Sequence, residues 1–426
     1  MYTLRRLLRE SFSGCALAAL SLSLVTPAWA QDPRPVDVGS LSPSFHAFRD
    51  TIRVAMERHP QVRAAQSRVE AAQHGLSASK WGRYPSLSAE MSRNDNGDTL
   101  RRVQVQQPLW AGGRIDADID LSNSRVGVAS ESLKETEFAL AEQMVLAAVE
   151  LAKARVQLAR ARESLDAYQK LSSAIERRAD GGLGLQSDVT LARSRIEQAR
   201  ALAAQFEASE RRANLRWMAL TGQPSTSLAV PEQTPADTGT LHELQDEAKA
   251  FSPTIARLKA EAEAAGFDAD VTRAVIWPQL SLRAVRSWQT GIVNQNETQY
   301  LGVLEYQPGA GIGVVDRARA AYSQRDAALA QIDKAVRDLE EQVGAAHADR
   351  AGFSARVQAL QSASAANAEV IDSFVRQYNI GKRTWLDVLN AQREWTESTQ
   401  SAEDTKYSAL AASYRLAVLS GRFFRP

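Results

Sequence analysis

The sequence is short of cysteine, of long apolar runs and of net charge, and each shortage excludes a class of protein. The single cysteine among 426 residues is Cys15, so disulfide frameworks, thiol catalysis and cysteine-bound metal are excluded for the chain after it. Beyond residue 30 no run of eighteen apolar residues occurs, as a membrane-spanning helix would need. Lysine and arginine number 51 against 50 acidic residues, so no net field recruits nucleic acid.

The first thirty residues have the pattern of an export signal. Three arginines precede an apolar stretch at 15–25, and Ala28-Trp29-Ala30 is a small-x-small cleavage site. The alternative, an uncleaved membrane anchor, needs about twenty apolar residues, more than the stretch at 15–25 provides. A lipoprotein would carry its cysteine after the apolar stretch, whereas Cys15 precedes most of it. We therefore predict a signal peptide at 1–30 that is removed on export.

The chain repeats itself at an offset of about 193 to 200 residues. The paired fragments are Pro60-Gln61-Val62 with Pro253-Thr254-Ile255, Tyr84-Pro85-Ser86-Leu87-Ser88 with Trp277-Pro278-Gln279-Leu280-Ser281, Gln107-Pro108 with Gln307-Pro308, and Gly182 with Gly381. Their common order indicates internal duplication. We predict a first repeat at 31–222, a proline-rich linker at 223–240 and a second repeat at 241–426.

Each repeat begins with a helical pattern that gives way to a strand pair. In the first repeat, apolar and polar residues alternate at 86–92 and again at 102–106, with a polar turn at 94–98 between them. We expect Pro108 to end the second strand. The second repeat has a strand at 280–284, a weaker one at 300–306, and a predicted loop near Asn294-Gln295-Asn296.

Long helices follow both strand pairs. Apolar residues recur every 3.5 residues from about 114 to 180 and from about 315 to 380, without a proline, and glycines end both runs. Such a helix is roughly 100 Å long. A shorter return helix follows each glycine break. The fold class predicted is mainly α with a small β part, built as two long antiparallel helical hairpins, each preceded by a β-hairpin.

Two β-hairpins leave open edges that lipid does not tolerate. Several chains that pool their strands would close a β-barrel, with one face in lipid and the other toward a wet lumen. The predicted lipid-facing residues are Leu87, Ala89, Met91, Val103 and Val105, and the lumen-facing ones are Ser86, Ser88, Glu90, Arg102, Gln104 and Gln106. The alternative, a soluble periplasmic coiled coil, accounts for the helices but not for the strands.

Four fragments in this order resemble the TolC family of outer-membrane export channels. They are His59-Pro60-Gln61-Val62, Tyr84-Pro85-Ser86-Leu87, Gln107-Pro108-Leu109-Trp110-Ala111-Gly112-Gly113-Arg114 and Tyr378-Asn379-Ile380-Gly381-Lys382-Arg383-Thr384-Trp385-Leu386-Asp387-Val388-Leu389. The resemblance implies a homotrimer in the outer membrane of a Gram-negative bacterium. Twelve strands would form one barrel in outer-membrane lipid, and twelve helices would continue it as a tunnel into the periplasm. It also implies two partners, a periplasmic adaptor and an inner-membrane ABC or proton-driven transporter.

The same resemblance implies a gate at the periplasmic helix tips, where the turns fall at Gly182 and Gly381. By position, Asp387 matches an acidic ring that constricts the pore, and three such carboxylates would raise one another's proton affinity. Asn390 stands where the family member compared has a second acid, which predicts a weaker filter. Asp188, Tyr378 and Arg383 match contacts that hold the tips shut. As alternatives, Asp188 and Asp387 are ordinary first-turn acids of their helices, and Tyr378 is a packing residue.

Catalytic patterns are missing. The five histidines show no metal-ligand spacing, and neither a nucleophile elbow nor a phosphate loop occurs. We therefore predict no enzyme, no metal site and no cofactor, and a passive duct for type I protein secretion or small-molecule efflux. The alternative function is that of a periplasmic coiled-coil adaptor, although adaptors have one helical hairpin rather than two.

Overall fold

We describe a computed structural model of the chain. It describes residues 43–93, 95, 98–182, 184–232, 234, 239–290, 295–307 and 313–425. The predicted signal peptide with Cys15 lies outside these residues, as do parts of the predicted turn at 94–98 and of the predicted linker at 223–240. All described residues belong to one of two units into which the chain divides, Leu41–Pro426.

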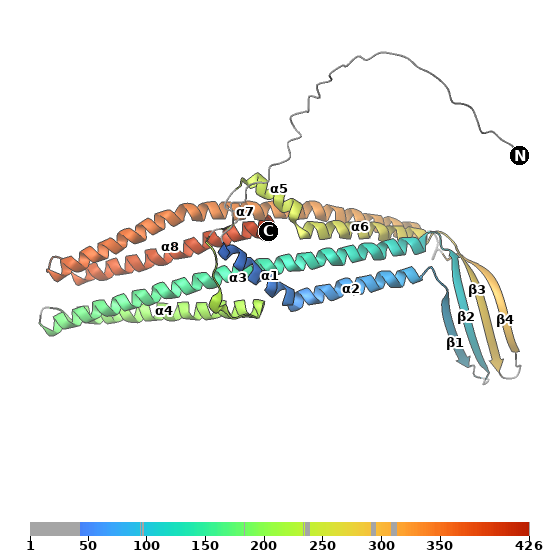
Figure 1. Cartoon of the computed structure of the whole chain (residues 1–426), viewed down its shortest axis with the longest axis horizontal. Helices are drawn as coiled ribbons and strands as arrows, with labels where there is room; N and C mark the ends of the chain where they lie inside the picture. Colours follow the sequence, from blue (N-terminus) through green and yellow to red (C-terminus); the bar gives the residue numbers. More distant parts are fainter. Residues whose placement is uncertain are drawn as a thin grey trace, which may run out of the picture. The chain divides into compact units, whose positions relative to one another are not determined.

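Helices make up most of this unit, and they occur twice in the same order (Figure 1). The first set is α1 Pro43–Arg58, α2 Pro60–Trp81, α3 Arg114–Asp180 and α4 Gln186–Thr221, and the second is α5 Leu241–Phe251, α6 Pro253–Ala274, α7 Gly313–Asn379 and α8 Trp385–Leu419. Short 3₁₀ turns follow α4 at Ser225–Ser227 and α8 at Arg422–Phe424. The long helices α3 and α7 contain 67 residues each, which confirms both predicted runs to within two residues at each end.

The repeated fragments that contain Pro60 and Pro253 are helix starts. Both prolines occupy the first turn, where a missing N–H costs nothing, and a side chain caps each helix. His59 Nδ1 accepts from the Gln61 N–H at 3.2 Å, and Ser252 Oγ accepts from the Ile255 N–H at 3.3 Å. None of the helices in the described part of the chain has both the length and the hydropathy needed to cross a membrane.

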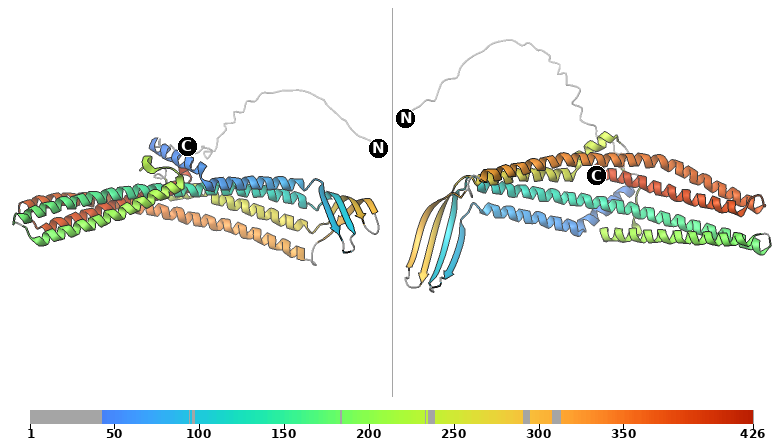
Figure 2. Two further views of the ribbon diagram at one scale, coloured as in Figure 1. Left: turned by 90° about the horizontal axis from the view of Figure 1, so that it is seen from below. Right: turned by 180° about the vertical axis from the view of Figure 1, so that it is seen from behind.

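The main core lies where α1, α5 and the end of α8 meet the long helices, midway along them (Figures 1 and 2). Aromatic side chains are prominent in it, including Phe45, Trp217, Tyr414 and Phe423, all fully buried. At Gly421 the backbone φ is +74°, and a Cβ would lie 2.4 Å from Cγ of Phe251. Only glycine fits this close approach.

The four strands form one antiparallel sheet in the order β1-β2-β3-β4. They are β1 Ser86–Arg93, β2 Thr99–Trp110, β3 Gln279–Thr290 and β4 Gln295–Glu305. The pairing of β2 with β3 joins the two halves of the chain. In Figure 2 the blue strands of the first half lie beside the yellow strands of the second half.

Two sequence-based expectations about the strands were wrong. Pro108 does not end β2, which continues to Trp110. Proline is tolerated there because Gln106 is the last residue paired with β1, so Pro108 lies where β2 has only β3 beside it, and a bulge follows it. The loop expected near 294–296 is a strand from Gln295 onward, because Gln295 and Asn296 pair with β3. Cross-strand pairing outweighs their low strand propensity.

The register assigns each strand residue to one of two faces. Leu87 pairs with Val105 and Ala89 with Val103, so the predicted apolar set shares one side, here called the Leu87 face. Glu90 pairs with Arg102 on the opposite side, here called the Glu90 face, which also carries the predicted polar set. The predicted alternation is therefore confirmed.

Candidate gate at the helix tips

The second hairpin turns at Gly381. There α7 ends in a Schellman motif: the Gly381 N–H donates to the Tyr378 carbonyl and the Lys382 N–H to the Gln377 carbonyl, both at 2.9 Å. Gly381 has a φ of +77°, which favours glycine. This turn reverses the chain into α8.

The first hairpin turns at the equivalent glycine, Gly182. Its φ is +73°, and its N–H donates to the Ala179 carbonyl at 2.9 Å. Helix α4 then begins at Gln186, and the Asp188 N–H donates to the Leu185 carbonyl at 3.1 Å. Within the described ranges the Asp188 carboxylate has no ion pair, so it is available to a group outside this chain.

Asp387 caps its own helix. Thr384 Oγ1 and the Thr384 N–H donate to Asp387 Oδ2 at 2.7 and 3.1 Å, and the Asp387 N–H donates back to Thr384 Oγ1 at 3.3 Å. This is a capping box. The hydroxyl bond first, and then the backbone bond, lower the pKa of Asp387. In a single chain, therefore, the carboxylate stays ionised, and the increase expected from a ring of three would have to overcome this effect.

Arg383 lies against its own hairpin. Its guanidinium stacks 4.3 Å from the ring centre of Phe374, its Nε donates to Gln377 Oε1 at 3.3 Å, and Nη1 lies 4.0 Å from Asp387 Oδ2. The expected partner Asp188 is on the other hairpin. No contact between Arg383 and Asp188 occurs among the described residues of one chain, so that contact stays a prediction for neighbouring subunits.

A small buried cluster packs the two hairpin ends against each other. It consists of Tyr168, Ile175, Val189, Ala192, Ala199, Trp385, Val388 and Leu389. Tyr378 packs on this cluster, with its ring 5.1 Å from that of Trp385 at 62°. Within one chain Tyr378 therefore packs on this cluster, and its role as a gate contact stays a prediction. Asn390 follows this cluster on α8 and is partly exposed.

Sequence reasoning missed Arg178, which links the two hairpins close to their turns. Its Nη1 donates to the Tyr378 carbonyl at 3.2 Å, and its guanidinium lies 4.8 Å from the centre of the Tyr378 ring. Arg178 is half-buried in the last turn of α3. The only sequence signal was a pair of arginines before a helix-ending glycine, and a backbone carbonyl 200 residues away leaves no pattern.

Apolar side chains are exposed at both tips. Leu185 and Ile380 are each 67% exposed, and Leu386 is 51% exposed. Isolated exposed apolar residues are ordinary, but three at the ends of the two hairpins make these ends candidates for contact with another protein.

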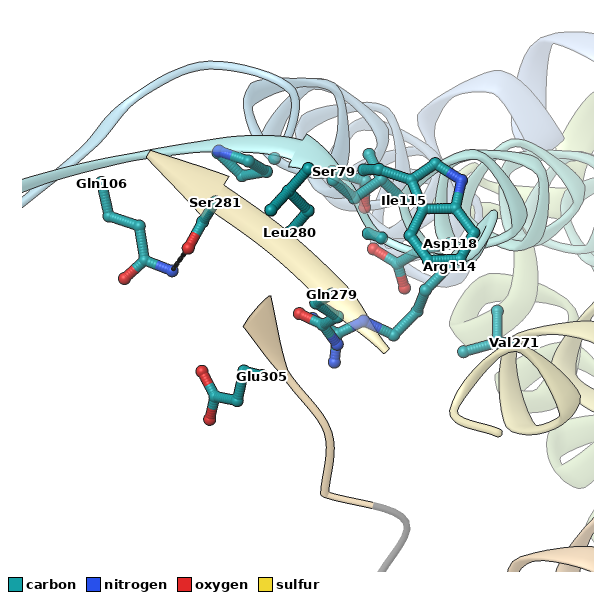
Figure 3. A pocket seen from close by; sticks show the side chains of 14 residues that line it. Ser79, Gln106, Arg114, Ile115, Asp118, Val271, Gln279, Leu280, Ser281 and Glu305 are labelled. Atoms are coloured by element: carbon teal, nitrogen blue, oxygen red, sulfur yellow. Dashed lines mark hydrogen bonds between the residues drawn. The ribbon is translucent and has the colours of Figure 1, made fainter. Parts of the chain in front are cut away.

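A hollow of about 400 Å³ lies at the other end of the long helices, between the sheet and α3 (Figure 3). Gln106 donates to Ser281 Oγ at 3.3 Å, and Arg114 donates to Gln279 Oε1 at 3.3 Å. The first bond joins β2 to β3 within the sheet, and the second fastens β3 to α3. Nowhere in the described ranges do three or more histidine, cysteine or acidic side chains gather as a metal site.

Comparison with known proteins identifies the family. The family model described as outer membrane efflux protein matches residues 51–223 and 244–422. The chain belongs to the outer membrane efflux protein family. This confirms the TolC-type resemblance, and members of the family are outer-membrane transport channels rather than enzymes.

Individual relatives agree with this assignment. The outer membrane efflux protein BepC of Brucella suis is 23% identical over 336 residues, 75% of this chain and 71% of that one. The probable efflux pump outer membrane protein TtgC of Pseudomonas putida is 23% identical over 300 residues, which cover 68% of this chain and 61% of that protein.

Solved structures share the fold. The outer membrane protein VceC of Vibrio cholerae has a TM-score of 0.73 at 18% identity, covering 88% of this chain and 96% of VceC. The CmeC outer membrane channel of Campylobacter jejuni has a TM-score of 0.74 at 14% identity, covering 90% and 91%. A single copy of this efflux-family chain therefore has the fold of one protomer of an α-barrel channel.

Proposed function

We propose that three copies of this chain form one outer-membrane duct. The observation that carries the proposal is the four-stranded sheet, whose outer strands β1 and β4 each have one unpaired edge. Open edges in lipid leave backbone groups without partners. Since β1 and β4 run in opposite directions, β4 of one copy meets β1 of the next in antiparallel fashion, and three copies close a barrel of twelve strands.

The proposed trimer places the helical hairpins in the periplasm, with their tips at the entrance. Asp387 and Asn390 line the constriction. Asp188 and Arg383 do not meet within one chain, so we place Asp188 of one subunit against Arg383 of its neighbour. A charge-assisted bond of this kind suits a gate, since it is strong yet reversible. Opening requires the hairpins of each chain to separate at Tyr378.

Two protein partners complete the proposed system. The exposed Leu185, Ile380 and Leu386 are where a periplasmic adaptor docks, and an inner-membrane transporter supplies the energy. We propose small molecules rather than secreted proteins as the cargo, because the relative from Pseudomonas putida is named as part of an efflux pump.

Reconstitution into planar bilayers tests this proposal. The purified chain is expected to run as a trimer in detergent and to form small, cation-selective channels. Asp387→Asn removes the charge but keeps an oxygen for the helix cap, so cation selectivity is expected to fall toward unity. Thr384→Val weakens the cap but keeps the charge, and selectivity is expected to persist. A monomer without conductance would refute the trimer, and unchanged selectivity in Asp387→Asn would refute the acidic constriction.

A further inference from the structure

Three arginines lie on the Leu87 face of the sheet, among side chains otherwise suited to lipid. Arg101 pairs with Met91 on one side and with Trp288 on the other, and Arg286 pairs with Val103. Arg93, at the end of β1, lies on the same face. All three side chains are exposed.

The carboxylates of the strands are all on the opposite face. The register of β3 with β4 assigns Glu297 and Glu305 to the same face as Glu90. There Arg102 donates to Glu90 at 3.2 Å. On the Leu87 face, Arg93, Arg101 and Arg286 have no acidic partner among the described residues. The segregation leaves three positive charges uncompensated on one side of the sheet.

The arginines follow a diagonal across the sheet, with a step of two residues from each strand to the next. Near the helices the Leu87 face is apolar, whereas Arg93 and Arg101 lie toward the strand ends where β1 finishes and β2 begins. Those strand ends are remote from the helices (Figures 1 and 2). Exposed aromatic residues mark the end of the sheet that adjoins the helices. One of them lies within β2 and two lie just before β1 and β3, and each is nine residues from the arginine of that strand. The pairs are Tyr84 with Arg93, Trp110 with Arg101, and Trp277 with Arg286.

This spacing matches a membrane. Nine residues at about 3.4 Å each cover roughly 30 Å along a strand, and a tilt of about 40° reduces this to about 23 Å. The apolar band of outer-membrane barrels is about 25 Å tall with aromatic girdles at its borders. The arginines therefore fall at the border remote from the periplasmic helices.

An open hollow of about 560 Å³ lies at this level. Its lining includes Met91, Arg101, Val103, Trp288 and Thr290 on the Leu87 face, together with Glu90 and Arg102, which pair with each other at 3.2 Å on the Glu90 face. The Arg286 guanidinium lies 5.2 Å from the centre of the Trp288 ring. The hollow thus combines positive charge, an interfacial indole and an apolar floor.

We infer that this surface binds the phosphorylated headgroup of an outer-leaflet glycolipid of the lipid A type. Arginine forks match phosphate oxygens, and the acyl chains would lie along Leu87 and Val105. The inference rests on the proposed trimeric barrel, which orients the Leu87 face toward lipid. It adds a ligand of defined chemistry to a face that the proposed function treats only as lipid-exposed.

Lipid titration of the full-length purified protein tests the inference. Native mass spectrometry from mixed micelles would measure binding of bisphosphorylated lipid A, phosphatidylglycerol and inorganic phosphate. Wild type is expected to prefer lipid A. Arg101→Gln with Arg286→Gln is expected to weaken lipid A binding at least ~10-fold, which corresponds to about 1.4 kcal/mol. Substitution of the same two positions by lysine is expected to retain part of the binding.

The matched control is Arg283→Gln, on the Glu90 face of β3 and outside the lining of the hollow, which is expected to leave lipid A binding unchanged. Equal binding by wild type and the double glutamine variant would overturn the inference, as would an equal loss in Arg283→Gln. Equal binding of inorganic phosphate would show a simple anion site instead. Conductance is recorded in parallel: conducting variants with unchanged lipid binding refute the lipid site alone, whereas non-conducting wild type refutes the duct and the lipid site together.

Discussion

Replacing Arg178 by methionine removes a direct link between the two hairpin tips while keeping a side chain of similar length. The wild-type residue supplies a charged hydrogen bond to the Tyr378 carbonyl and a cation–π contact with its ring. Such a bond contributes about 1.5–3 kcal/mol and such a contact about 0.5–1 kcal/mol. Because the site is only half-buried, we expect a loss of about 2 kcal/mol per chain, roughly a 30-fold shift toward separated tips.

Single-channel recording measures this shift, because separated tips raise conductance or the frequency of open events. Arg177→Met is the control: Arg177 is the exposed neighbour in the same helical turn and forms no ion pair in the described part of the chain. We expect Arg178→Met to conduct more than wild type and Arg177→Met to match wild type. Equal traces for Arg178→Met and wild type would show that this contact does not hold the tips together.

Two further predictions concern stability. Gly421→Ala forces a Cβ against Phe251 at a positive φ, which should cost about 2–4 kcal/mol and lower the denaturation midpoint. The control Gly344→Ala adds a Cβ that meets no other atom, so it should raise the midpoint slightly. Equal midpoints for the two variants would contradict the close approach at Gly421. Since the pKa of Asp387 is lowered in the folded chain, its capping contribution is present above its ordinary pKa of 3.8 and is lost as the pH falls through the lower folded value. Thr384→Val should therefore reduce Tm more at pH 7 than near pH 2, where only the bond from the Asp387 N–H to Thr384 Oγ1 is left to lose, and a constant difference at both pH values would exclude this linkage.

The helices were predictable because their pattern is local. A 3.5-residue period without proline, bounded by glycine, located both α3 and α7 to within two residues at each end. The sharing of strand faces was also predictable from alternation. The boundaries of the repeats at 31–222 and 241–426 and of the linker at 223–240 stay predictions.

What the sequence could not reveal depends on distant partners. The end of β2 is set by where β1 stops pairing, and the start of β4 is set by its register with β3. Likewise, Arg178 faces a carbonyl on the other hairpin, so neither residue type nor spacing marked it. Arg383 was predicted to meet Asp188, but within one chain it packs on its own hairpin, a contact set by the tight turn at Gly381.

The equal length of α3 and α7 has an evolutionary consequence. Both contain 67 residues, and both are followed by return helices of nearly the same size, 36 and 35 residues. Deleting one heptad from a single helix would retract its tip by about 10 Å and leave the other hairpin protruding. Lineages that shorten or extend this reach must therefore accept insertions or deletions in all four helices together and in whole heptads, so stalk length should vary in steps rather than gradually.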